Sequence, residues 1–87
     1  MQLIVVSALW CPSCLILKKH LKRLNEEYSL DIKILDYDFD EVEVNNLNVG
    51  KKLPVMIIFD GDNEVSRLIG EKNYDEIIEF LKEYKMI

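Results

Sequence analysis

Residues 10–14 read Trp-Cys-Pro-Ser-Cys and stand between an apolar run at residues 2–7 and an amphipathic segment that begins at Pro12. Residues 2–7 are short, continuous and rich in β-branched side chains, which is typical of a buried strand. From Pro12 to about Tyr28, apolar side chains recur every three or four positions, which predicts a helix with one buried face. Proline suits the first turn of this helix because its missing N–H has no partner there. Both cysteines therefore stand at a strand-to-helix junction.

The rest of the chain predicts an alternation of strands and helices that ends in a hairpin and a helix. The predicted elements are a strand over 31–38, a short helix over roughly 40–48, a strand from Leu53 to Asp60, a turn over 60–63, a returning strand over 64–70 and a helix that is capped by Asn73 and runs to the C-terminus. The order is β-α-β-α-β-β-α, which predicts one α/β domain over residues 1–87. A right-handed crossover makes the first two strands parallel, and the hairpin completes a four-stranded mixed sheet flanked by helices.

Composition and charge narrow the class of protein. The chain has 87 residues, 49% hydrophobic and 31% charged, which fits one globular domain and excludes a disordered chain. A net charge of −5 argues against a nucleic-acid partner. The apolar run at residues 3–10 is too short to cross a bilayer and lacks a basic leader. We therefore expect a cytoplasmic protein with no membrane partner.

The chain contains two cysteines, three positions apart. A disulfide between residues this close in sequence cannot stabilise the fold by linking distant segments. Cys11 at the helix start would face the unpaired N–H groups and the positive end of the helix dipole, which favour a thiolate. Cys14 falls on the inner face of the same helix. The spacing therefore predicts one reactive thiolate, Cys11, and one shielded resolving thiol, Cys14, as two-step thiol–disulfide exchange requires.

Three other interpretations of the cysteines stay open. A zinc site needs four ligands, and His20 is the only other cysteine or histidine, which leaves one ligand short. The cysteines are alternatively inert core residues, or the fold serves only as an interaction module. The strand-to-helix junction favours redox chemistry over all three.

A run of acids at Asp36, Asp38 and Asp40 is similar to the opening of a calcium loop. Glu41 stands where such a loop needs glycine, and Leu47 stands where it needs glutamate. The alternation with aromatic residues is more typical of a strand end with one wet edge.

The chain resembles the thioredoxin superfamily, in the short form shared with glutaredoxins. Almost the whole length carries the resemblance: Trp-Cys-x-x-Cys after the first strand, a proline that opens the third strand and Gly70 after the fourth. The resemblance implies that Pro54 is cis and faces the cysteine pair, and that Leu53 offers backbone groups to an extended substrate. It also implies that Trp10 flanks the pair at the surface and that Pro12 borders the substrate. A trans proline and a core tryptophan are the plainer alternatives.

Some residues of the motif resemble thioredoxins and others resemble glutaredoxins. Trp10 is like thioredoxin, and Pro12 directly after the first cysteine is like glutaredoxin. Val5 stands where thioredoxins usually carry the buried aspartate that accepts the proton of the resolving cysteine. One glycine, Gly70, stands where glutaredoxins usually carry two before an acid. The length leaves room for the minimal core, without the N-terminal strand and helix of full-length thioredoxins.

We expect a monomeric thiol–disulfide oxidoreductase that exchanges a Cys11–Cys14 dithiol or disulfide with protein or small-molecule disulfides. It would serve electron transport and cell redox homeostasis. Its partners are disulfide-containing proteins, with a flavoprotein reductase or glutathione as the electron donor. No metal or organic cofactor is needed because the dithiol carries two electrons itself. The alternative from another class is a non-catalytic binding module with this fold.

Overall fold

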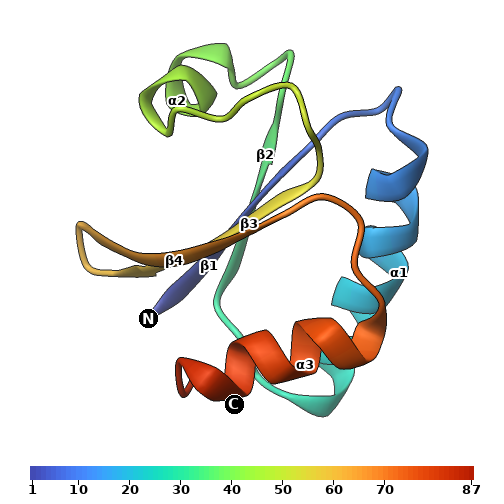
Figure 1. Ribbon diagram of the computed structural model, residues 1–87, viewed down its shortest axis with the longest axis vertical. Coiled ribbons are helices and arrows are strands. Elements are labelled where there is room, and N and C mark those ends of the chain that lie inside the picture. The colour runs from blue at the N-terminus through green and yellow to red at the C-terminus, as the bar shows by residue number, and fades with distance from the viewer.

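Four strands and three helices follow one another in the predicted order in the computed structural model, which describes all 87 residues (Figure 1). They are β1 (Gln2–Ser7), α1 (Pro12–Glu27), β2 (Ile32–Asp36), α2 (Glu41–Asn46), β3 (Val55–Asp60), β4 (Asn63–Ile69) and α3 (Tyr74–Glu83). The strands form one sheet in the order β2-β1-β3-β4. β1 is parallel to β2, and β3 is antiparallel to both β1 and β4, so the predicted four-stranded mixed sheet is confirmed. None of the helices combines the length and the apolar character needed to cross a membrane.

The central strands β1 and β3 are largely buried on both faces of the sheet, which explains why they are apolar without alternation. α1 and α3 cover one face and α2 lies on the other (Figure 1). Successive side chains of β1 point to opposite faces, so Leu3 and Val5 pack with α1 and α3, whereas Val6 packs with Val44 of α2. The larger of the two clusters joins the sheet to α1 and α3, and the smaller one contains both cysteines.

β2 is shorter than the sequence predicts because aspartates turn the chain after it. The Asp36 carboxylate accepts hydrogen bonds from the backbone N–H groups of Asp38 and Phe39, at 2.9 and 3.0 Å. The Asp40 carboxylate accepts one from the N–H of Asp36 at 2.8 Å. Aspartate side chains that bond nearby backbone groups favour turns over strands. The prediction of a strand over 31–38 is therefore wrong beyond Asp36, and the acids belong to a turn.

α3 begins where the sequence predicts, at the N-cap Asn73. The Asn73 carboxamide oxygen accepts a hydrogen bond from the N–H of Glu76 at 2.8 Å, and the Glu76 carboxylate accepts one from the N–H of Asn73 at 3.3 Å. This reciprocal capping box satisfies two N–H groups that have no partner within the helix. The helix ends at Glu83, four residues before the C-terminus that the sequence analysis assigned to it.

We expect Asn73→Ala to lower the free energy of unfolding by about 1 kcal/mol, because alanine cannot accept the hydrogen bond from Glu76. Urea denaturation followed by circular dichroism measures the change. Asn25→Ala is the matched control, since Asn25 lies exposed in the interior of α1 and caps nothing. Equal stability of Asn73→Ala and the wild type would contradict a stabilising cap.

Candidate functional site

Cys11 ends the loop after β1 and is the N-cap of α1. Its backbone is extended, with φ −99° and ψ 111°, and Pro12 opens the helix behind it. The Cys11 sulfur accepts a hydrogen bond from the backbone N–H of Cys14 at 3.3 Å, so a thiol occupies the place that serine or aspartate usually takes. No acidic residue lies in the first turn. The N–H group and the helix dipole therefore both stabilise negative charge that develops on this sulfur.

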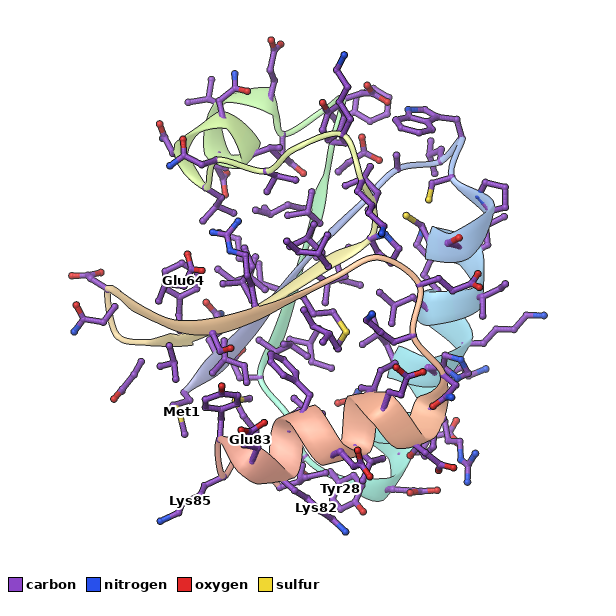
Figure 2. All side chains as sticks on the ribbon, viewed as in Figure 1. Met1, Tyr28, Glu64, Lys82, Glu83 and Lys85 are labelled. Atoms are coloured by element: carbon purple, nitrogen blue, oxygen red, sulfur yellow. The ribbon has the colours of Figure 1, made fainter.

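Both cysteines are free thiols, and both are largely covered by other residues. Cys11 is 7% exposed and Cys14 is fully buried. Sulfur atoms are visible at the start of α1 in Figure 2. The prediction that Cys14 is the more shielded of the two is confirmed. A disulfide that reacts here must approach from the side on which Cys11 retains its small exposed surface.

Burial and the neighbouring sulfur hold Cys14 in its protonated form. Burial raises the pKa of Cys14 to about 11, and a hydrogen bond with the Cys11 side chain adds to this effect. A hydrogen bond with the Ala8 backbone and the Lys18 charge act in the opposite direction and lower this pKa. Val5 lies in the core on the α1 side of the sheet and has no proton-accepting group.

Leu53 and Pro54 stand directly before the first residue of β3. The peptide bond between them is cis, as the resemblance implied. The Leu53 side chain is buried in the same cluster as Cys11 and Cys14. The Leu53 N–H and C=O form no hydrogen bond within the protein, whereas the Pro54 carbonyl accepts one from the N–H of Gly70 at 2.8 Å. Leu53 therefore keeps one free donor and one free acceptor beside the cysteine pair.

Lys52 lies across Gly70, a contact that the sequence analysis missed. Gly70 has φ +89°, a conformation that strongly favours glycine, and a Cβ there would stand 2.9 Å from Cε of Lys52. No sequence signal links these two residues, because the cis turn and the end of β4 meet only in the folded chain. The contact brings the Lys52 ammonium group to Gly70, the residue whose N–H is bonded to the Pro54 carbonyl.

Trp10 lies at the surface, so the alternative of a core tryptophan is wrong. Its side chain is 59% exposed, its indole N–H donates a hydrogen bond to the Asp38 carboxylate at 2.7 Å, and its ring meets Tyr37 edge-on with centroids 6.0 Å apart. The sequence pattern alone does not predict Asp38 as this partner. The available signal was topological: both residues follow parallel neighbouring strands, which pair Ser7 with Asp36 at their carboxyl ends.

His20 lies far along α1 and packs against Tyr74 of α3, with ring centroids 5.8 Å apart. No group of three or more histidine, cysteine, aspartate or glutamate side chains is arranged to hold a metal ion. Among the residues that the sequence predicts for the site, the structure places Cys11, Cys14 and Leu53 in one buried cluster. Trp10 lies at the surface directly before Cys11.

Comparisons with known proteins agree with this geometry. The sequence model of the thioredoxin family matches residues 1–83. Thioredoxin 1 from Thermosipho africanus superposes with a TM-score of 0.84 at 19% identity, over 98% of this chain and 94% of that one. A mutant thioredoxin from Halobacterium salinarum gives a TM-score of 0.85 at 20% identity, over 98% and 74%. Oxidised thioredoxin O2 from Arabidopsis thaliana gives a TM-score of 0.80 at 18% identity, over 94% of this chain and 72% of that one. No curated protein sequence matches the chain.

The raised pKa of Cys14 predicts a pH dependence of stability in the dithiol form. The folded state holds the Cys14 proton more tightly than the unfolded chain does. The contribution of this protonated thiol to the free energy of unfolding is therefore complete below the ordinary cysteine pKa of 9.0 and is lost as pH rises toward about 11. We expect the wild type to lose roughly 2–3 kcal/mol relative to Cys14→Ala across this window. Urea denaturation of both reduced proteins at pH 8, 9, 10 and 11 gives the difference. A constant difference would contradict a shielded Cys14 thiol.

The hydrogen bond between Trp10 and Asp38 predicts a change in the only indole N–H signal of the chain. We expect Asp38→Ala to shift this proton resonance upfield and to speed its exchange with solvent, because the charged acceptor is lost. Asp38→Asn is the matched variant, since its carboxamide oxygen still accepts. Two-dimensional NMR of the three proteins measures both effects. An unchanged resonance in Asp38→Ala would show that Asp38 does not hold the ring in solution.

Proposed function

Because the chain belongs to the thioredoxin family, we propose that it is a thiol–disulfide oxidoreductase that exchanges a Cys11–Cys14 dithiol with disulfides of other proteins. The observation that carries the proposal is the Cys11 sulfur at the N-cap of α1, bonded to the N–H of Cys14 at 3.3 Å. This position stabilises a thiolate, which is the nucleophile in disulfide exchange. The second thiol lies one helical turn away, within reach of the first.

In the first step, the Cys11 thiolate attacks one sulfur of a substrate disulfide. A bond forms between the two sulfurs, the substrate disulfide breaks, and the leaving substrate thiolate takes up a proton. In the second step, Cys14 loses its proton and attacks the Cys11 sulfur. The second substrate thiol leaves, and a Cys11–Cys14 disulfide remains. Two electrons pass from the dithiol to the substrate, so neither step requires a metal or an organic cofactor.

The substrate is held as an extended segment beside the Leu53–Pro54 turn. The free N–H and C=O of Leu53 pair with the substrate backbone in the manner of an added strand. The exposed Trp10 ring and Pro12 border the segment on the side of α1. This arrangement explains how a disulfide reaches Cys11 although little of its side chain is exposed.

The second step is held back by the burial of Cys14. The raised pKa of Cys14 keeps this thiol protonated at neutral pH. Capture of the substrate ties up the Cys11 sulfur and removes its negative charge, which is one of the causes of the raised pKa. Burial remains, and Val5 supplies no proton acceptor, so we expect the mixed disulfide to persist longest at low pH.

The oxidised dithiol is returned to its reduced form by an external thiol, either glutathione or the dithiol of a flavoprotein reductase. We place this cycle in cytoplasmic electron transport and redox homeostasis. One comparison separates the two donors: reduction of the oxidised protein by glutathione alone and by NADPH with a thioredoxin reductase. Faster reduction by glutathione assigns a glutaredoxin-like role, and faster reduction by the reductase assigns a thioredoxin-like one.

We expect Cys11→Ser to reduce insulin at the uncatalysed background rate, because no nucleophile remains at the helix N-terminus. Cys14→Ser should instead accumulate a mixed disulfide with the substrate on Cys11, which intact mass spectrometry detects as an added mass removed by dithiothreitol. Turbidity of the insulin B chain follows the rate. Background rates for the wild type as well as Cys11→Ser would reject the enzyme and favour a non-catalytic binding module.

A further inference from the structure

A groove runs between α1 and the outer edge of β2 and takes no part in the proposed cysteine chemistry. Its volume is about 360 Å³. Four apolar side chains and two lysines form most of its lining: Leu21, Leu30, Ile32, Ile34, Lys18 and Lys22. The groove therefore combines an apolar wall with positive charge on the α1 side.

β2 is an edge strand, so one row of its backbone groups has no partner strand. The N–H of Leu3 donates to the Asp31 carbonyl at 2.9 Å, and the N–H of Tyr37 donates to the Ser7 carbonyl at 2.7 Å. These bonds show that odd-numbered residues around β2 direct their backbone groups toward β1. Because the groups alternate along a strand, even-numbered residues direct theirs away from the sheet.

The free edge offers two pairing positions. Ile32 and Ile34 are the even-numbered residues whose N–H and C=O point outward without a partner. The outward N–H of Asp36 is already bonded to the Asp40 carboxylate at 2.8 Å. A strand added to this edge can therefore pair along Ile32 and Ile34 and must end at Asp36.

The side chains at these positions lie on the groove side of the sheet. Ile32 and Ile34 are in register with Leu3 and Val5, which pack under α1. Ile34 is 50% exposed. An added strand would continue this face and place every second side chain in the groove, in contact with Ile34.

The charge of the groove selects among occupants. Lys18 and Lys22 form no ion pair, whereas Lys33, on the opposite face, lies 3.2 Å from Glu43. Two-fold pairing of β2 with a second copy would bring the lysines of both copies to the same face without carboxylates between them. A segment that carries acids as well as apolar residues at the positions that face the groove would instead give both lysines partners.

We propose that the β2 edge and the groove beside it bind an extended segment of a partner protein in which every second residue faces the groove, and in which these groove-facing residues include both apolar and acidic side chains. The segment adds a strand to β2 at Ile32 and Ile34. Its apolar side chains fill the groove, and its carboxylates face Lys18 and Lys22. This surface works independently of Cys11, so it can hold a partner whether or not a disulfide is exchanged.

The fluorescein-labelled peptide Glu-Thr-Val-Thr-Val-Thr-Glu, in which both valines and both glutamates lie on one face of the strand, tests the proposal with the full chain. We expect saturable binding by fluorescence anisotropy that weakens as salt rises. The amides of Ile32 and Ile34 should shift in NMR spectra and exchange more slowly with solvent. The same peptide with lysine in place of both glutamates is the charge control and should not bind. Equal binding of the two peptides, or no binding of either, would overturn the proposal.

Two variants locate the contact. Ile34→Lys fills the groove with a charged side chain, and Lys22→Glu reverses a charge at its rim; each should weaken binding roughly tenfold. Lys19→Glu is the matched control because Lys19 is exposed on α1 and does not line the groove. An equal loss of peptide binding in Lys19→Glu would show that binding depends only on the net charge of the protein, and it would contradict a contact at Lys22. Concentration-dependent dimers that the peptide cannot dissociate, measured by analytical ultracentrifugation, would assign the edge to a second copy instead.

Discussion

The hydrogen bond from the Cys14 N–H to the Cys11 sulfur joins the fold of this protein to its chemistry. A helix needs an acceptor at its first turn, and here the acceptor is the atom proposed to attack the substrate. The first turn of α1 is thus stabilised most when the Cys11 sulfur carries a negative charge. This charge disappears when the sulfur enters a disulfide, and the stabilisation then weakens. Local stability at the start of α1 and the redox state of the pair are therefore linked.

Topology assembles the remainder of the site around that junction. The carboxyl ends of the parallel strands β1 and β2 meet, which brings Asp38 to Trp10. β3 runs in the opposite direction to β1. Its first residues, with the cis turn at Leu53–Pro54, therefore lie at the same end of the sheet as the carboxyl ends of β1 and β2. Three segments distant in sequence thereby surround a sulfur that is almost covered. The core cluster that contains both cysteines is also the floor of the proposed substrate site.

Patterns within one element were readable from the sequence, and contacts between elements mostly were not. The order of strands and helices, the cap at Asn73 and the shielding of Cys14 depend on local periodicity and spacing, so they were predicted correctly. The end of β2 was missed because aspartate side chains that bond the backbone override an alternating pattern. The partners of Trp10 and Gly70 depend on chain crossings, which no periodicity encodes.

The packing of Lys52 over Gly70 limits which residues can replace glycine at position 70. Position 70 is constrained twice, by its φ of +89° and by the lysine stem that occupies the space of a Cβ. Shortening the side chain at position 52 removes the second constraint and leaves the first. In evolutionary terms the two positions have unequal freedom: relatives can change the charge beside the cis turn through position 52, while we expect glycine to persist at position 70.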